Sequence, residues 1–267
     1  MIRLPRIPDI LTTANLGCGT ASILLASQGQ LTWACWLVFA GALFDVFDGL
    51  AARALGGGTP LGAQLDSLAD MVTFGVAPAM IAAIDPVNAL DRTVWQHRDH
   101  LPAGAQAQGS MLVEPLWMAA AIAIIISTAS CWRLAKFNTD TRQTHGFLGL
   151  ATPANGLFWA SMGIASWGLG VNHGPGYNEL MNHVVAFMSD PVRKVILATI
   201  LGVLMVSEIP LPSLKFKQFK WQGNQVIYLL IGIGMLLVLL YGILGVPLIL
   251  LLYLLSPIWG KPFRTTT

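Results

Sequence analysis

Four aspartates lie between residues 45 and 70, inside two otherwise apolar segments of the sequence. Asp45 and Asp48 are three residues apart, and Asp66 and Asp70 are four apart, so each pair shares one face of a helix. A carboxylate at bilayer depth is costly, and residues of this kind are retained there for a reason. The four aspartates are therefore the first candidates for chemistry.

The residues between the two pairs predict a sharp reversal of the chain. They read Gly56-Gly57-Gly58-Thr59-Pro60, a composition that does not favour a continuous helix. In an antiparallel hairpin closed by this turn, both pairs lie roughly 12 to 20 Å from it at about 1.5 Å per residue. We therefore expect the four carboxylates to converge on one small volume.

Four carboxylates in one volume need either protonation of some of them or bound cations, because like charges repel. An all-carboxylate site suits hard divalent cations such as Mg²⁺ or Mn²⁺. Two such ions can clamp a diphosphate and stabilise the charge that develops during displacement at phosphorus. Gly49 and Gly62 leave room for a ligand on each helix, and Arg53 can reach a phosphate.

Two other interpretations of the same cluster are open. The carboxylates could be structural, paired with Arg53 and Arg133 to hold helices together. They could also form the cation or proton site of an ion-coupled transporter. The glycine-rich turn favours an open pocket at one end of the helices over an occluded site at the midplane.

The composition shows what kind of molecule positions these residues. Of the 267 residues, 55% are hydrophobic and only 10% are charged, whereas soluble domains carry roughly 25% charged residues. These values exclude a soluble globule, a disordered chain and a free nucleic-acid binder. The three cysteines lie in apolar stretches, which indicates free thiols and no disulfide framework. The chain is an integral membrane protein, and we expect a single membrane domain over residues 1–267.

The pattern of apolar runs predicts an all-α polytopic fold with about eight transmembrane helices, since each span needs about 20 apolar residues. The polar N-terminus does not resemble a signal peptide, so the first run is expected to be a retained span. The last two spans come from one long run that starts at Gln225 and is broken near Gly245 and Pro247. The expected spans are 10–28, 32–55, 62–84, 112–136, 153–171, 192–210, 225–244 and 246–259.

The distribution of lysines and arginines predicts the orientation. With the N-terminus inside, eleven basic residues fall on the cytoplasmic side and four on the other, so both termini are expected to be cytoplasmic. The segment 85–111 is then an outer loop, in which His97 and His100 have no ligand-like spacing for a metal. Lys215, Lys217 and Lys220 alternate with aromatic residues and are expected to contact anionic membrane lipids.

At this point the residues match a known pattern. Asp45-x-x-Asp48-Gly49-x-x-Ala52-Arg53, eight residues, Gly62-x-x-x-Asp66-x-x-x-Asp70 resembles the complete signature of the CDP-alcohol phosphotransferases. The resemblance implies transfer of a phosphatidyl or similar group from a CDP-linked lipid to an alcohol, with release of CMP. It also implies a six-helix core, here over 7–221, and it suggests a homodimer. The long apolar run predicts the C-terminal helical hairpin at 222–267, outside the resemblance. With the orientation given by the basic residues, we expect a protein of the cell membrane whose active site faces the cytoplasm.

The resemblance also implies roles for single residues. Asp45, Asp48, Asp66 and Asp70 become ligands of Mg²⁺ or Mn²⁺, with two ions expected, and Asp70 is in addition the base that takes the proton of the acceptor. The residues implied to contact the CDP-linked lipid are Gly49, Ala52, Arg53, Thr59 and Gly62.

Three further polar residues have two interpretations each. Asn15 is predicted either to hydrogen-bond the nucleotide or to hold helices together through its amide. Arg133 and Lys136 lie three residues apart on one helical face. They are predicted either to bind the acceptor or a phosphate, or to be ordinary basic residues flanking a span.

Other segments resemble one branch of the family, the phosphatidylserine synthases. They are SLADMVTFGVAPAM from Ser67, WRLAKFN from Trp132, GFLGLATPAN, and LMVSEIPLPSLKFK from Leu204. This resemblance implies CDP-diacylglycerol and L-serine as substrates, with a glycerol-phosphate or inositol-phosphate acceptor as the alternatives within the family. No nucleic-acid partner is expected.

Overall fold

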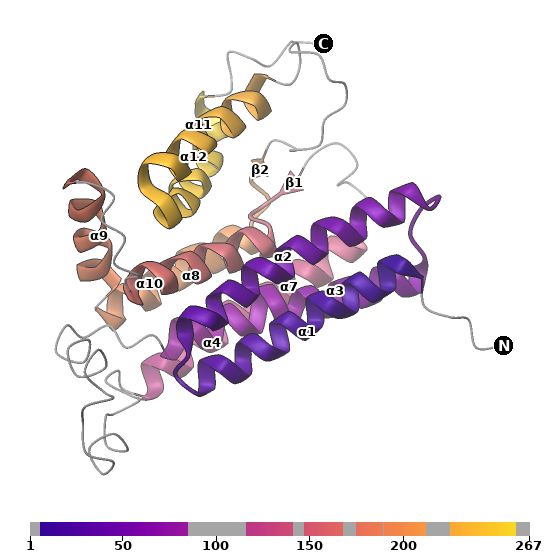
Figure 1. Ribbon diagram of the computed structural model, residues 1–267, viewed down its shortest axis with the longest axis horizontal. Coiled ribbons are helices and arrows are strands. Elements are labelled where there is room, and N and C mark those ends of the chain that lie inside the picture. Colours follow the sequence, from indigo (N-terminus) through magenta and orange to yellow (C-terminus); the bar gives the residue numbers. More distant parts are fainter. Residues whose placement is uncertain are drawn as a thin grey trace.

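The structure is a computed structural model, and it describes residues 6–84, 116–140, 147–167, 175–188, 190–211 and 225–259. The expected outer loop with His97 and His100 lies outside the described residues, as does the segment with Lys215, Lys217 and Lys220. The described chain consists almost entirely of helices (Figure 1).

The first part of the chain forms three long helices that pack side by side. Helix α1 spans Ile7–Ser27 and α2 spans Leu31–Ala54. The third is continuous through α3 (Pro60–Asp70), the π-helical segment η1 (Met71–Val76) and α4 (Ala77–Ile84).

The predicted reversal between α2 and α3 is present. Gly56 and Gly57 adopt φ values of 89° and 111°, a region that favours glycine. The hydroxyl of Thr59 then accepts a hydrogen bond from the backbone N–H of Gly62 (2.9 Å), and Pro60 occupies the first turn. The turn therefore ends one helix and starts the next, which places the two aspartate pairs on facing helices.

The rest of the chain adds helices around this group, together with a two-stranded antiparallel pairing in which Phe147 lies opposite Leu211. Helix α9 was not expected from the sequence. The remaining elements are α7 (Leu116–Thr139), β1 (Phe147–Leu148), α8 (Thr152–Trp167), α9 (Pro175–Met188), α10 (Pro191–Val206), β2 (Pro210–Leu211), α11 (Gln225–Tyr241), η4 (Gly242–Leu244) and α12 (Gly245–Trp259).

Five helical segments of the described chain are long and apolar enough to cross a membrane, which confirms a helical polytopic membrane protein. Helices α8 and α10 have 16 residues each, fewer than the about 20 that a perpendicular span needs. The count of eight spans and the orientation stay predictions. The five segments are Ile7–Ser27, Leu31–Ala54, Pro60–Ile84, Trp117–Thr139 and Gln225–Pro257.

The last of these five segments contains the predicted break. Helices α11 and α12 pack side by side at the top of Figure 1, joined by the short turn η4. A Cβ at Gly245 would lie 2.8 Å from the Cα of Val238, so only glycine permits this close return of the chain. The hairpin is thus as expected, and the division into a core at 7–221 and a hairpin at 222–267 stays a prediction.

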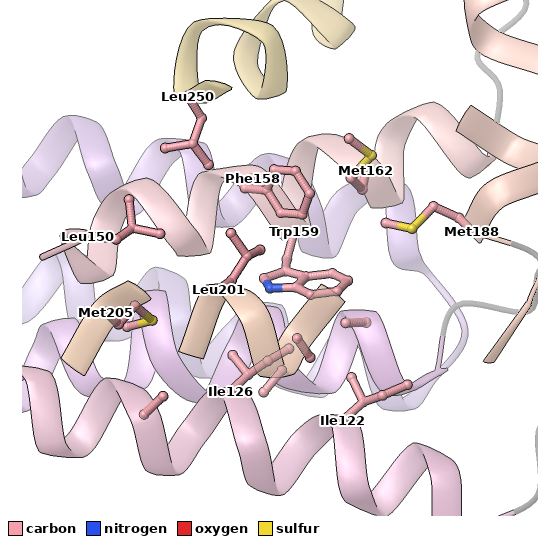
Figure 2. Close-up of a cluster of buried hydrophobic side chains, with 14 residues drawn as sticks. Ile122, Ile126, Leu150, Phe158, Trp159, Met162, Met188, Leu201, Met205 and Leu250 are labelled. Carbon is pink, nitrogen blue, oxygen red and sulfur yellow. The ribbon is translucent and has the colours of Figure 1, made fainter. Parts of the chain in front are cut away.

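Helix α8 separates two hydrophobic clusters and contacts both. On one side, Trp159 packs with side chains of α7, α10 and α12, among them Ile126, Leu201 and Leu250 (Figure 2). On the other side, Ala160 packs with residues of α1, α2, η1 and α4. Gly156 lies so close to η1 that a Cβ there would be 2.9 Å from the Cα of Phe74. The helix that carries the aspartates is therefore fixed directly against α8.

One end of the bundle gathers the α2–α3 turn, the end of α7 and the β1–β2 pair (Figure 1). The amide of Asn138 donates to the Ser67 hydroxyl (2.9 Å), which joins α7 to α3. Lys136 forms an ion pair with Glu208 (3.0 Å), just before β2. This is the end that we expect to face the cytoplasm.

Candidate active site

The aspartates of α2 and α3 converge as their spacing predicts. Each of Asp45, Asp48 and Asp66 offers a carboxylate oxygen, and these three atoms lie within 4.8 Å of one another. Asp45 and Asp48 come from α2 and Asp66 comes from α3, so the α2–α3 reversal is what brings them together.

Asp70 lies one helical turn deeper than Asp66, directly before η1. It is buried, with 8% of its surface exposed. On each helix the cluster therefore has one carboxylate nearer the turn, Asp48 or Asp66, and one farther along, Asp45 or Asp70.

Helix α1 supports this cluster with two side chains that are themselves buried. The hydroxyl of Thr12 donates to Oδ2 of Asp48 at 2.6 Å, and the amide of Asn15 donates to Oδ1 of Asp70 at 3.2 Å. The hydroxyl of Thr73 in turn donates to the backbone oxygen of Asn15 at 2.9 Å. Each of these contacts fixes a carboxylate, or its partner, in one orientation.

The donor set and its surroundings fit a divalent cation. Oδ1 of Asp66 is buried and has no hydrogen-bond partner among the described residues. No ion pair to any of the four aspartates is found in the described part of the chain either. Hard carboxylate oxygens in this arrangement are the ligands that Mg²⁺ and Mn²⁺ prefer. Asp45, Asp48 and Asp66 could therefore hold a metal ion.

A cavity of about 220 Å³ lies between the cluster and the α2–α3 turn. Six residues singled out in the sequence line it, and Thr59 both lines it and caps α3. Three polar residues of the first helix region also line it, together with Pro8, and sequence reasoning missed them. The six are Asp48, Gly49, Ala52, Thr59, Gly62 and Asp66, and the three are Arg6, Asp9 and Thr12.

The three missed residues have a recognisable signal. Asp9 and Thr12 are polar and three residues apart on one face of an apolar helix, the same type of spacing that marked the aspartates. Asp9 also accepts a hydrogen bond from the backbone N–H of Arg6 at 2.9 Å, which caps α1. A Cβ at Gly62 would lie 3.2 Å from Oδ1 of Asp9, so α1 approaches α3 closely at Gly62.

Two other predicted residues lie near the cavity without lining it. Arg53 is exposed at the end of α2, and its Nη1 would lie 3.7 Å from a Cβ at Gly49. Asn15 faces Asp70 instead of the cavity. This hydrogen bond between two helices corresponds to the interpretation in which the Asn15 amide holds helices together.

The two cations of α7 lie away from this cavity. Arg133 is only 3% exposed, and its Nε donates to the backbone oxygen of Leu150 at 3.1 Å. Its guanidinium also lies over the ring of Phe137, 5.6 Å from the centroid. Lys136 contacts Glu208 and the Val206 oxygen. The alternative in which Arg133 pairs with the aspartates is therefore not what the structure contains.

Comparison with known proteins agrees with this site. The family model described as CDP-alcohol phosphatidyltransferase matches residues 6–167, more than half of the chain. A relative from Helicobacter pylori is 30% identical over 235 residues, covering 86% of this chain and 81% of the relative. A relative from Methanocaldococcus jannaschii is 28% identical over 244 residues, covering 90% and 92%.

A third relative, from Bacillus subtilis, is 27% identical over 209 residues, covering 78% of this chain and 91% of its own. All three relatives are named CDP-diacylglycerol–serine O-phosphatidyltransferase. The family match includes α1, α2, α3 and α8, and thus every aspartate of the cluster. The chain is therefore an enzyme of the CDP-alcohol phosphatidyltransferase family.

Proposed function

We propose that the protein transfers the phosphatidyl group of CDP-diacylglycerol to L-serine and so forms phosphatidylserine and CMP. The observation that carries this proposal is the convergence of Asp45, Asp48 and Asp66 beside a cavity, with Asp70 one turn deeper. The names of the three relatives support serine as the acceptor.

The cavity is the place for the nucleotide end of the donor. Gly49, Ala52 and Gly62 keep its walls free of bulk, and Arg53 at its edge offers charge to a phosphate. Asp45, Asp48 and Asp66, with Asp70, would hold Mg²⁺ or Mn²⁺, most simply as two ions, which neutralise the diphosphate and stabilise charge at phosphorus.

Asp70 is the base in this proposal. The serine hydroxyl oxygen forms a bond to the phosphorus that carries the diacylglycerol, and its proton passes to the Asp70 carboxylate. The bond from that phosphorus to the bridging oxygen breaks, and CMP leaves with this oxygen. An alcohol is a poor nucleophile unless a base removes its proton, and such a base contributes about 10²- to 10⁴-fold in rate. Asn15 holds the carboxylate of Asp70 in place for this transfer.

The setting of the reaction is also part of the proposal. We place the protein in the cell membrane as a homodimer, with the α2–α3 turn on the cytoplasmic side. There the acceptor is supplied from water and the donor from the bilayer. Arg133, buried near the same end of the bundle, is the cation that we assign to the serine carboxylate.

Incorporation of radiolabelled L-serine into lipid tests the proposal. Purified protein in lipid vesicles should form labelled phosphatidylserine and CMP only when CDP-diacylglycerol and Mg²⁺ or Mn²⁺ are present, and EDTA should abolish the reaction reversibly. Glycerol 3-phosphate and inositol phosphate serve as competing acceptors. Label transfer to either of these and not to serine would assign a different acceptor, and full turnover after thorough chelation would contradict the metal requirement.

A further inference from the structure

Three buried polar atoms on one face of α8 have no hydrogen-bond partner among the described residues. They are Oγ1 of Thr152, Oδ1 of Asn155 and Nε1 of Trp159. Their residues are 2%, 1% and 1% exposed, and the spacing of three and four residues places them on the same face. Buried polar groups are paired in the great majority of native structures, so a polar ligand or water is expected at this face.

This face lies at the depth of Asp70. Gly156 contacts the backbone at Phe74, and both α8 and the helix of the aspartates begin at the same end of the bundle. Thr152 precedes Gly156 by four residues, and Asp70 precedes Phe74 by four residues as well. Two helices that run in the same direction from one contact therefore bring Thr152 and Asp70 to the same level.

Helix α7 places a cation at this level too. A Cβ at Gly75 would lie 3.0 Å from the Cβ of Ser130, and Arg133 follows Ser130 by one turn toward the same end of the bundle. The Nε of Arg133 donates to the backbone oxygen of Leu150, two residues before α8 begins. The guanidinium of Arg133 therefore lies next to the N-terminus of α8, and the dipole of that helix favours an anion there.

The indole of Trp159 closes this region on the inner side. In Figure 2 it lies between α8, α7 and α10, and its nitrogen is on the side of the ring nearer to Leu150. The buried side chains packed around it in this cluster, such as Ile122 and Ile126, are apolar. The three unpaired polar atoms therefore lie within the first two turns of α8, next to this apolar cluster.

We propose that Thr152 and Asn155 form, together with Arg133, the subsite that binds the carboxylate and ammonium groups of the acceptor amino acid. Arg133 and the Thr152 hydroxyl face the carboxylate, and Oδ1 of Asn155 accepts a hydrogen bond from the ammonium group. The acceptor hydroxyl is then directed to Asp70. This inference rests on the proposed function, and it names the residues that select a serine-like acceptor.

The test compares variants that keep the side-chain shape and remove the polar atom. Thr152→Val and Asn155→Leu should each raise the KM for L-serine about tenfold or more, because each loses a hydrogen bond to a charged ligand group. The KM for CDP-diacylglycerol should change less than about twofold, and the thermal midpoint should stay or rise because an unpaired polar group is removed. Thr152→Ser, which restores the hydroxyl, should recover the serine KM.

Ser166→Ala is the matched control on the same helix. The Ser166 hydroxyl is also buried and unpaired among the described residues, but it lies far along α8 from Asp70. This variant should leave both KM values unchanged. If Thr152→Val and Asn155→Leu behave in the same way, the polar atoms are satisfied by water only and the subsite is wrong.

Two other results would also overturn the subsite. A fall in thermal midpoint, with the KM for both substrates raised equally, would make the two residues structural. Wild-type protein that transfers phosphatidyl groups to another alcohol and not to serine would refute the proposed function, and the amino-acid subsite with it. If the wild type uses serine and the variants keep its KM for serine, only the subsite is wrong. If the wild type does not use serine, the proposed function is wrong as well.

Discussion

The side-chain amide of Asn15 donates a hydrogen bond to Oδ1 of Asp70, with 3.2 Å between the nitrogen and the oxygen. Both residues are buried, and they lie on different helices, 55 residues apart in sequence. The first helix therefore orients the carboxylate of Asp70, the base that we assign to the reaction.

Asn15→Leu tests this relationship. The variant keeps the bulk of the side chain and removes the hydrogen bond, so we expect turnover to fall about 10- to 100-fold, as for other groups that orient a functional carboxylate. Donor affinity should change much less. Measured loss of donor binding with normal single-turnover rates would instead place Asn15 on the nucleotide, the other interpretation of the sequence.

Thr12→Val tests the support of Asp48. The hydroxyl of Thr12 donates to Asp48 at 2.6 Å, and loss of such an outer contact typically weakens metal affinity about 10- to 100-fold. The Mg²⁺ or Mn²⁺ concentration for half-maximal activity should rise accordingly. Thr13→Val is the control, because the exposed Thr13 hydroxyl donates to the backbone oxygen of Asp9 in its own helix. An equal shift in both variants would contradict the role of Thr12.

Gly19→Ala tests the close packing of α1 against the helix of the aspartates. A Cβ at Gly19 would lie 2.7 Å from the Cα of Thr73, so the helices must separate, at a cost of about 1–3 kcal/mol in stability. Gly17→Ala, on the same helix with nothing within 4 Å, should stabilise the fold by about 0.5–1 kcal/mol. Thermal unfolding in detergent measures both, and equal midpoints would refute the tight contact.

The orientation of the chain predicts which loops can be labelled from outside. With the excess of basic residues in the cytoplasm, Gln106→Cys should react with an impermeant thiol reagent in intact cells, and Gln218→Cys should not. The background lacks Cys18, Cys35 and Cys131. The reverse pattern would invert the topology.

The sequence predicted the parts of this protein that depend on local spacing. The helical positions of Asp45, Asp48 and Asp66, and the reversal at Gly56 and Gly57, required only the period of a helix and the conformational freedom of glycine. The apolar runs likewise predicted the long helices and the break near Gly245, because length and hydropathy are local properties.

What the sequence did not predict depends on contacts between distant residues. Thr12 is one of many small polar residues, and only the packing of α1 on α2 shows that it bonds Asp48. The pairing of Lys136 with Glu208 and the burial of Arg133 arise in the same way. Helix α9 was missed because its polar residues do not form a membrane span, and the π-helical segment after Asp70 has no marker in the sequence.

In the proposed reaction, Asp45, Asp48 and Asp66 hold the metal and the donor, and Asp70 takes the proton in addition to contributing a metal ligand. The direct test measures CDP-diacylglycerol affinity and single-turnover rate for Asp70→Asn and Asp48→Asn, at saturating metal. Asp70→Asn should lower the rate about 10²- to 10⁴-fold while donor binding changes little, and Asp48→Asn should weaken donor and metal binding together. Near-normal turnover of Asp70→Asn, or an equal loss of donor binding in both variants, would contradict the account.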